Sequence, residues 1–531
     1  MKQTELNLTT LENWLWDAAC EIRGATDAPK YKDFILPLIF FKRLSDVYDD
    51  ELAQLMTLFG NEDLAQYMIE ADHKALEQNP QRKNDPRLVP IIRFYIPKEY
   101  AWNTIRHHPR DGKTLGEFVT TALREVAERN SELKGVLNVK DYNEQHQDQR
   151  VLDDEHLGAL IEVISRQRLG LKDTQPDMLG RAYEYLLRKF AEGQGQSAGE
   201  FFTPIEVGQL MAKILNPIPL STVYDPTCGA GGLLIKARML FEETHPNQKT
   251  QAPRLYGQEL NPVTFAMAKM NMFLHDYVNS KFHIGDTLRK PAFQDTDNSI
   301  KRFDYVVANP MWNQKHYKEE FYKEETKRFK FGTPPSNSAD WAWVQHIYAS
   351  LKPQGVAAIV LDTGAISRGS GSKSGHKERD IRKQFVEKDL IECVILLPEN
   401  LFYNTTAPGI ILILNRQKRR EGILLINASE HFVQEKPKNV LTEAAINAVA
   451  GVYQQWETRE KLSRVVSLEE IREADYNLSP SQFVQVTEAV SHRSLSEILT
   501  DLQAARLARE EADSELARVL AKLGLNGRNR L

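Results

Sequence analysis

The chain has 531 residues and a formal net charge of −5, and a length beyond the roughly 250 to 300 residues that one hydrophobic core serves predicts two or three domains. Its composition, 41% hydrophobic and 27% charged, excludes a disordered or membrane-spanning protein, and the lack of an apolar leader or an apolar run of about 18 residues indicates a cytoplasmic one. The three cysteines show no CxxC spacing and predict no metal site. The net charge also lacks the excess of basic residues expected of a protein that binds nucleic acid through its own phosphate contacts.

Residues 1–166 carry the periodicity of amphipathic helices. Apolar side chains recur at steps of three and four residues in two stretches, which comprise Leu11, Trp14, Leu15, Ala18, Phe34, Leu38, Phe41 and Leu44. Several prolines between residues 80 and 97 interrupt the pattern with turns. We therefore expect an all-helical N-terminal domain that serves packing and partner docking, without a catalytic cluster of its own.

Residues 174–420 change to short apolar runs separated by helical patterns. The runs occupy residues 222–224, 255–257, 305–308, 356–361, 393–397 and 410–414. Strands spaced in this way by helices are typical of the α/β class. The segment therefore predicts a doubly wound, mostly parallel sheet of the Rossmann-like kind.

A glycine-rich turn follows the first of these strands. It runs through Asp225, Pro226, Thr227, Cys228, Gly229, Ala230, Gly231 and Gly232. Glycines let the backbone leave a strand sharply and approach a ligand closely. The spacing is GxGG rather than the GxGxxG of dinucleotide-binding proteins, and no GKS or GKT follows it. We expect a ligand loop rather than a purely structural turn.

Carboxylates end the next two strands at the same edge. Glu259 follows the run at 255–257, where its oxygens can accept both hydroxyl protons of a ribose. Asp286 ends a third candidate strand, and by the same logic it can accept from an adenine amino group. Together with the glycine loop, these acids predict a site for a nucleoside-containing cofactor.

The strand at 305–308 leads directly into Asn309, Pro310, Met311 and Trp312. An exocyclic amine on a purine is a poor nucleophile because its lone pair is delocalised into the ring. An asparagine oxygen and a backbone carbonyl held rigid by Pro310 can each accept one amino hydrogen and so free that lone pair. Trp312 offers a flat face for a base extruded from a duplex. The tetrapeptide thus fits methylation of an amine, although an Asn-Pro turn alone is more often structural.

Each of two polar stretches beyond the tetrapeptide has two possible interpretations. Residues 315–330 mix Lys and Glu with aromatics, which suits either a lid over an extruded base or an exposed helix. Residues 367–377 are basic and rich in Gly and Ser, which suits either contact with a DNA backbone or a plain solvated loop.

Residues 421–531 are polar and end in a heptad pattern at about 495–523. The a and d positions hold Leu495, Ile498, Leu502, Ala505, Arg509, Ala512, Leu516, Val519 and Leu523. This pattern predicts a helical tail whose stripe lies either on a partner chain or on the protein's own domain.

Taken in order, these motifs resemble those of the amino-methyltransferases of DNA, and the whole chain resembles the modification subunit of type I restriction-modification systems. The segment Gly199 to Pro204, with Glu200, Phe201, Phe202 and Thr203, is similar to the family's G-x-F/Y-F/Y-T-P motif, which surrounds the methionine part of the cofactor. Asn309 to Trp312 is similar to the N-P-P-F/Y motif, with Met311 in place of the second proline. Segments 338–341 and 397–402 also resemble the family.

The resemblance implies a methyltransferase fold, S-adenosylmethionine as the cofactor and N6 of adenine in DNA as the acceptor. Asn309, Pro310 and Trp312 would be catalytic. The cofactor residues would be Glu200, Phe201, Phe202, Thr203, Pro204, Asp225, Thr227, Cys228, Gly229, Ala230, Gly231, Glu259 and Asp286. The family further implies two copies of this chain per complex, a specificity subunit that reads the DNA sequence, and a restriction subunit.

Other functions remain to be weighed. An amino-methyltransferase of the same fold acting on RNA or on a protein glutamine shares the tetrapeptide, and a non-catalytic assembly scaffold shares the fold. A C5-cytosine methyltransferase needs a Pro-Cys nucleophile, which is missing from the sequence. A nicotinamide-dependent oxidoreductase leaves the tetrapeptide unexplained.

Overall fold

The computed structural model describes most of the chain. The described residues are 8–22, 31–79, 91–107, 114–138, 140–146, 149–171, 173, 180, 182, 184–186, 189, 203–277, 279–296, 299–315, 317–325, 327–403, 405–436, 438–486 and 495–522. They divide into two units, Met1–Val484 and Gln485–Leu531, which are described separately. Among the helices of these residues, none is long and apolar enough to cross a membrane.

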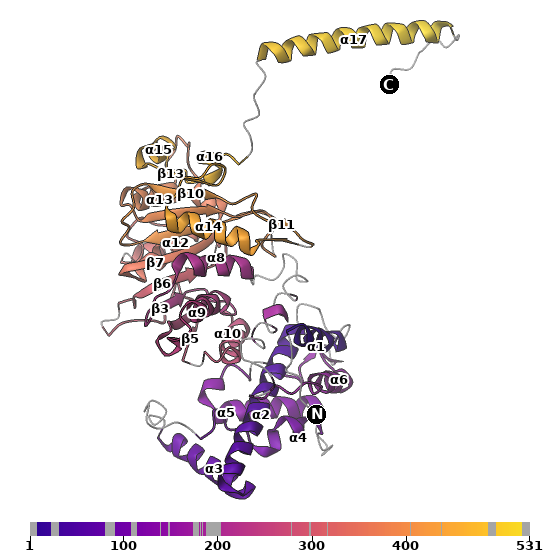
Figure 1. Ribbon diagram of the computed structural model, residues 1–531, viewed down its shortest axis with the longest axis vertical. Coiled ribbons are helices and arrows are strands. Elements are labelled where there is room, and N and C mark those ends of the chain that lie inside the picture. The colour runs from indigo at the N-terminus through magenta and orange to yellow at the C-terminus, as the bar shows by residue number, and fades with distance from the viewer. Residues whose placement is uncertain are drawn as a thin grey trace. The chain divides into compact units, whose positions relative to one another are not determined.

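The N-terminal part of the first unit is built from helices around a shared apolar core (Figure 1). Its helices are α1 (Leu8–Glu21), α2 (Tyr31–Phe59), α3 (Glu62–Gln78), α4 (Trp102–Arg106), α5 (Leu115–Arg129) and α6 (Asp154–Ile164), with 3-10 turns η3 (Lys98–Tyr100) and η4 (Ser131–Leu133). The stretches that showed helical periodicity supply the core, as Leu11, Phe34 and Phe41 are fully buried. One two-residue ladder, β1 (Gln145–His146) with β2 (Gln149–Arg150), departs from the expected all-helical structure.

Local sequence explains where several helices begin. Thr114 caps α5 in a capping box with Glu117, so that two backbone N–H groups left open at the helix start are satisfied. Asn261 caps α10 (Pro262–Leu274), and Pro262 occupies a first-turn position that needs no N–H. The turn after Glu259 is therefore fixed in direction.

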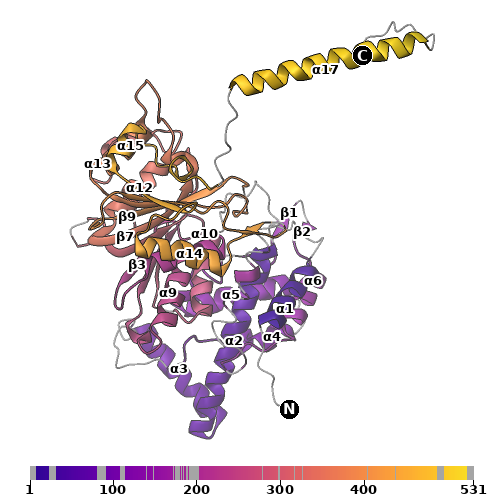
Figure 2. The same ribbon diagram turned by 45° about the horizontal axis from the view of Figure 1, so that its top comes forward.

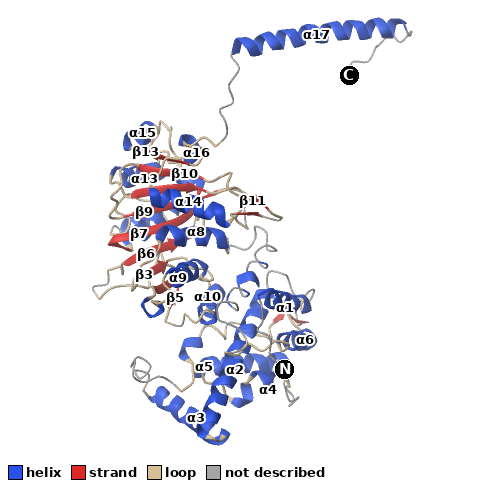
Figure 3. Cartoon of the chain, in the orientation of Figure 1, coloured by secondary structure: helices blue, strands red, loops and turns tan. Residues whose placement is uncertain are grey.

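A nine-stranded sheet forms the rest of the first unit (Figure 3). Its order is β13-β10-β8-β9-β7-β6-β3-β4-β5. The strands are β3 (Thr222–Asp225), β4 (Arg254–Glu259), β5 (Lys281–Ile284), β6 (Phe303–Ala308), β7 (Leu351–Asp362), β8 (Ile391–Leu396), β9 (Gly409–Asn415), β10 (Ile423–Asn427) and β13 (Ser463–Val466). Most neighbouring pairs run parallel, which confirms the expected sheet; β9 runs antiparallel to both β7 and β8.

Helices cover both faces of this sheet, as the two apolar cores show. On one face lie α8 (Ile205–Leu215), α9 (Gly232–Thr244) and α14 (Glu443–Gln455). On the other lie α12 (Asp340–Ala349), α13 (Lys377–Glu387), α15 (Leu468–Glu473) and α16 (Pro480–Phe483). Successive residues of a strand point to opposite faces of the sheet, so that in β9 Ile411 packs into one core and Leu412 into the other.

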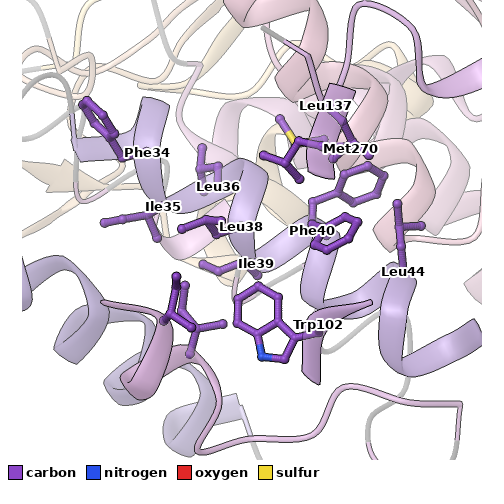
Figure 4. Close-up of a cluster of buried hydrophobic side chains, with 14 of the residues drawn as sticks. Phe34, Ile35, Leu36, Leu38, Ile39, Phe40, Leu44, Trp102, Leu137 and Met270 are labelled. Atoms are coloured by element: carbon purple, nitrogen blue, oxygen red, sulfur yellow. The ribbon is translucent and has the colours of Figure 1, made fainter. Parts of the chain in front are cut away.

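Helix α10 is shared between the sheet and the N-terminal helices. Met272 packs in the core under the sheet, whereas Met267 and Met270 belong to the N-terminal core. Figure 4 shows Met270 beside Phe40 of α2. The ring of Phe273 stacks on Phe40 with centroids 5.7 Å apart. A helix that is apolar on both sides thus couples the first helical region to the sheet.

The sheet continues beyond residue 420, where the sequence analysis ended the domain. β10 pairs in parallel with β8, and β13 pairs antiparallel with β10. The boundary at 420 therefore does not coincide with the end of the sheet. The apolar run Ile423 to Ile426 is short and follows a charged stretch, so it gave little signal against its polar surroundings.

Further along, β11 (Val433–Gln434) and β12 (Asn439–Val440) form a separate two-stranded ladder. β11 is labelled in Figure 1, and Figure 2 shows α14 from a second side. The second unit contains α17 (Leu495–Lys522), which spans nearly the whole expected heptad helix. Most of its described apolar side chains are exposed, with Leu502 at 55% and Leu516 at 57%, whereas Leu520 is half-buried.

Candidate active site

The glycine loop connects β3 to α9 at the carboxyl end of the central strands. Gly229 and Gly231 take positive φ values of 53° and 83°, which favour glycine. A Cβ on Gly231 would lie 2.6 Å from the Cε atom of Met272, so a larger residue there would displace the end of this side chain in addition to straining the backbone. The side chain of Asn271 donates to the Ala230 carbonyl over 3.1 Å and holds the loop from α10.

Glu259 at the end of β4 lies against this loop. One of its carboxylate oxygens accepts from the backbone N–H of Gly229 and the other from that of Asn261, both at 2.9 Å. The structure thus brings together the glycine loop and the carboxylate expected to bind a ribose.

Asp225 is almost fully buried at the start of the loop. It accepts from the backbone N–H of Thr227 at 2.9 Å. Burial, with a smaller contribution from the charge of Glu259, raises the pKa of Asp225 to about 8. Burial likewise raises the pKa of the Cys228 thiol, whose own backbone N–H donates to Gln258. Cys228 is therefore a packing residue of the loop rather than a thiolate.

Asp286 lies after β5 and next to the same loop. The hydroxyl of Thr287 donates to the Pro226 carbonyl at 2.6 Å, which joins the two segments. Asp286 accepts from the hydroxyl of Tyr317 at 3.0 Å and pairs with Arg289 at 3.4 Å. Sequence reasoning missed Tyr317, which comes from a different part of the chain.

Asn309 follows β6 directly and is 8% exposed. Its Nδ2 donates to the hydroxyl oxygen of Thr203 over 2.9 Å. Within the described residues, its Oδ1 is buried without a hydrogen-bond partner. A buried acceptor without a donor destabilises the folded protein, and such groups in native proteins usually bind a ligand or a water. The geometry therefore leaves one acceptor of Asn309 for a donor that none of the described residues supplies.

The segment before α8 is only partly described. Glu200, Phe201 and Phe202 lie outside the described residues. Pro204 stands at the N-cap of α8, and Thr203 precedes it. The structure thus brings Thr203 to Asn309, a contact that the sequence analysis did not foresee because it expected Thr203 only beside the cofactor.

Trp312 is half-buried and packs against an aromatic from the loop between β8 and β9. The rings of Trp312 and Phe402 meet edge to face, with centroids 4.9 Å apart and an interplanar angle of 71°. The backbone of Gly409 packs against both rings, because a Cβ there would lie 2.7 Å from Phe402 and 3.1 Å from Trp312. Met311, the departure from the usual tetrapeptide, is half-buried.

The aromatic side chains described between residues 315 and 330 form a packed cluster, although many of the Lys and Glu side chains there are exposed. The short helix α11 (Glu319–Glu324) lies in it, and Tyr317, Tyr322 and Phe329 are at most 5% exposed. They pack with Trp343 of α12. Periodicity was too weak in this short helix to reveal the cluster.

The basic stretch 367–377 is largely neutralised within the first unit. Arg368 pairs with Asp340, Asp362 and Glu378, and Lys377 pairs with Glu319. These two cations are thus held by the protein's own carboxylates.

Comparison with known proteins agrees with this arrangement. A family profile described as N-6 DNA Methylase matches residues 174–492, and one described as HsdM N-terminal domain matches residues 11–164. The MjaVIII type I restriction enzyme methylase subunit of Methanocaldococcus jannaschii is 36% identical over 489 residues, which cover 89% of this chain and 78% of that protein. The HindI type I restriction enzyme methylase subunit of Haemophilus influenzae is 31% identical over 444 residues, covering 80% of this chain and 96% of that protein.

Among solved structures, the type I restriction-modification system methyltransferase subunit from Streptococcus thermophilus superimposes with a TM-score of 0.74. It is 28% identical, and the match covers 90% of this chain and 99% of that chain. The similarity therefore extends through both the helical region and the sheet.

Proposed function

The chain belongs to the N-6 DNA methylase family, and on this basis we propose that it transfers a methyl group from S-adenosylmethionine to the exocyclic N6 of adenine in DNA. The observation that carries the proposal is the Oδ1 of Asn309, which no described residue bonds, at the carboxyl end of β6, the strand next to β3 and its glycine loop. We also propose that the chain acts in the cytoplasm, where its DNA substrate would be found.

The residues at the carboxyl edge fit this cofactor. The turn at Gly229 and Gly231 leaves backbone room that side chains would fill, and Glu259 presents a carboxylate at the next strand. Asp225 would face the positively charged part of the cofactor, and Asp286 would accept from its adenine amino group. Thr227, Cys228, Ala230, Thr203 and Pro204 complete the surroundings, and Glu200 to Phe202 stay part of the proposal. S-adenosylmethionine supplies a methyl group made electrophilic by its sulfonium.

Asn309 prepares the acceptor amine. Its free Oδ1 accepts one amino hydrogen, and the carbonyl of Pro310, on a backbone stiffened by the proline ring, accepts the other. The nitrogen is drawn toward tetrahedral geometry, and its lone pair becomes available without a strong base. Because the acceptors are fixed in advance, they need no reorganisation as charge develops on the nitrogen.

Trp312 would bind the adenine after it leaves the duplex, since a stacked base cannot reach an enclosed cofactor. One edge of the indole is supported by Phe402 and Gly409, so its orientation is fixed before the base arrives. Replacement of the second proline by Met311 removes rigidity but no hydrogen-bonding group, and we expect transfer to survive it.

Sequence choice would come from a separate specificity subunit, and a restriction subunit would complete the complex around two copies of this chain. The net charge of −5 supports a partner that supplies part of the DNA grip. The exposed heptad stripe of α17 supports a helical docking site for the specificity subunit.

The test is methylation of DNA by the full chain co-purified with a specificity subunit. Nucleosides from the digested product are separated and identified by mass spectrometry. We expect N6-methyladenine from the native chain, its loss in Asn309→Ala, and unchanged cofactor affinity in that variant by calorimetry. Asn447→Ala, at an exposed position of α14, serves as the matched control. Full activity of Asn309→Ala, or methyl groups on RNA, on a protein or on cytosine C5, contradicts the proposal.

A further inference from the structure

Arg368 stands at the centre of a buried cluster of carboxylates. Its Nε donates to Glu378 at 2.6 Å and its Nη1 to Asp362 at 3.0 Å, while Nη2 donates to both Asp340 and Glu378. The carboxylates come from three different elements, namely the start of α12, the end of β7 and the first turn of α13. One guanidinium therefore ties together three parts of the catalytic edge.

The cluster depends on this one arginine. Asp340 and Glu378 have side-chain exposures of 0% and 3%. A buried carboxylate without a counter-ion is strongly unfavourable, and here Arg368 faces three carboxylates. The planar fork of arginine can serve several acceptors at once, which the ammonium of lysine cannot do in the same geometry.

Two of these carboxylates reach the catalytic segment through Asn313. The backbone N–H of Asn313 donates to Asp340 at 2.9 Å, and its Nδ2 donates to Asp362 at 3.3 Å. Asn313 follows Trp312 directly and has a positive φ of 54°, a strained conformation that surrounding contacts must hold. The peptide after Trp312 is thus fixed by acids that are themselves fixed by Arg368.

The backbone that carries Arg368 is also held. Arg382, which is fully buried, donates to the carbonyls of Arg368 and Ala365 at 3.1 and 3.2 Å. A Cβ on Gly364 would lie 2.2 Å from Nη1 of Arg368, so the guanidinium packs directly on the turn at the end of β7. The described contacts of the guanidinium are thus with the protein's own turn and carboxylates.

We propose that Arg368 is a positioning residue for methyl transfer, which acts through Asp340 and Asp362 on Asn313 and so sets the orientation of Trp312 against the extruded adenine. The inference rests on the proposed function. It assigns to the basic stretch 367–377 an internal role at Arg368 in place of contact with the DNA backbone.

The test uses the full chain with its specificity subunit and compares three variants. Arg368→Lys keeps the charge but loses the fork. Asn313→Gly keeps the positive φ and the bond to Asp340 but loses the bond to Asp362, without leaving a buried charge unpaired. Arg106→Lys, in a comparable two-pronged arginine–glutamate pair on the surface at Glu162, is the matched control.

We expect kcat to fall about tenfold in Asn313→Gly and up to about a hundredfold in Arg368→Lys, since small displacements of positioned groups cost this much. Cofactor affinity should stay within about twofold of the native value. Fluorescence of 2-aminopurine placed at the target adenine should change in both variants, because it reports how the extruded base is stacked. The control should move none of these quantities.

Three results separate the possibilities. Native kcat and native 2-aminopurine fluorescence in both Arg368→Lys and Asn313→Gly would overturn the inference. A weaker salt dependence of DNA binding in Arg368→Lys, with normal kcat at saturating DNA, would instead identify a phosphate contact and overturn it too. Absence of methylation by the native complex would refute the proposed function itself, which these variants do not test.

Discussion

The Nδ2 of Asn309 donates to the hydroxyl oxygen of Thr203 over 2.9 Å, across 106 positions of the sequence. An asparagine amide can rotate by half a turn and exchange its donor for its acceptor. Thr203 engages the donor end and thereby leaves the acceptor end, Oδ1, for the substrate amine. The threonine next to Pro204 therefore bears on the chemistry as well as on the expected cofactor pocket.

Removal of this hydroxyl should lower the rate of transfer. In Thr203→Val the amide of Asn309 loses its partner, and we expect kcat to fall about tenfold to a hundredfold, in line with the roughly 1 to 3 kcal/mol of an unsatisfied buried polar group. Thr203→Ser keeps the oxygen and should retain most of the activity. Single-turnover methylation at saturating cofactor measures the difference. Equal rates in the two variants would rule out an orienting role.

Glu259 should govern cofactor affinity. Glu259→Gln keeps the size of the side chain but replaces a charged acceptor by a neutral amide, and we expect Kd for S-adenosylmethionine to rise roughly tenfold to a hundredfold, since hydrogen bonds to charged groups are worth about 1.5 to 3 kcal/mol. Calorimetry on the native chain and the variant gives the comparison. Glu243→Gln, at an exposed position of α9, should bind as the native chain does. Native affinity in Glu259→Gln would remove this carboxylate from the cofactor site.

Cofactor binding should depend on pH through Asp225. Its pKa of about 8 means that the carboxyl group carries a proton at neutral pH when no cofactor is bound. A positively charged ligand favours the carboxylate, so binding should release a proton and affinity should rise between about pH 6 and 8, by at most about tenfold per unit. Calorimetry in buffers of different ionisation enthalpy counts the protons.

The raised pKa of Asp225 also determines how the stability of the folded chain changes with pH. The folded chain holds the proton up to about pH 8, whereas the unfolded chain loses it near its ordinary pKa of 3.8. The contribution of Asp225 to the free energy of unfolding therefore decreases as pH rises through this interval. Asp225→Asn should flatten both pH dependences. A variant that keeps the native pH profile would show that another group titrates.

The contact around Trp312 predicts a further variant. Gly409→Ala adds a methyl group that would overlap Phe402 and touch Trp312, so the indole must move. We expect a higher KM for DNA and a lower kcat, with unchanged affinity for the cofactor. Gly451→Ala in α14, where a Cβ would meet nothing within 4 Å, is the control. Tryptophan fluorescence and steady-state kinetics report both effects, and native kinetics in Gly409→Ala would contradict this assignment.

The second unit allows a test of subunit assembly with a control in the same helix. Leu502 and Leu516 belong to the heptad stripe, whereas Leu507 is exposed at 63% but lies off it. Leu502→Glu and Leu516→Glu should weaken association with the specificity subunit, because a charge in an apolar seam is costly. Leu507→Glu should associate normally. Light scattering of co-expressed subunits measures the outcome. Equal association of all three variants would show that the stripe is not the interface.

Much of the fold could be predicted because strands and helices differ in the spacing of their apolar residues. The apolar runs ending at Tyr224, Gly257 and Ala308 lie within β3, β4 and β6. Spacing does not give strand direction, so the reversal of β9 was out of reach. The pattern also did not place β10 and β13 in the sheet, because each is a short strand of four or five residues within a charged part of the chain.

The site residues that were missed are those whose role depends on distant partners. Asn271, Asn313 and Arg368 are ordinary polar residues in the sequence, and they acquire a function only where folding sets them beside Ala230, Asp340 or Asp362. The site residues that could be predicted were glycines required by the backbone of a turn and polar side chains directly after strands. Buried polar pairs leave no periodic trace, since their partners come from any part of the chain.

The reversed direction of β9 has a practical consequence. Because β9 starts at the edge where β8 ends, the connection between them leaves and rejoins the sheet on adjacent strands. Within its described residues, the backbone N–H of Asn400 donates to the Thr406 carbonyl. Cys20 is exposed, whereas Cys228 and Cys393 are buried. A chain with Cys20→Ser and Ala407→Cys would accept one fluorophore on the exposed part of this loop, a few residues from Phe402. Such a label would follow the arrival of an extruded base in real time without any alteration of the catalytic side chains.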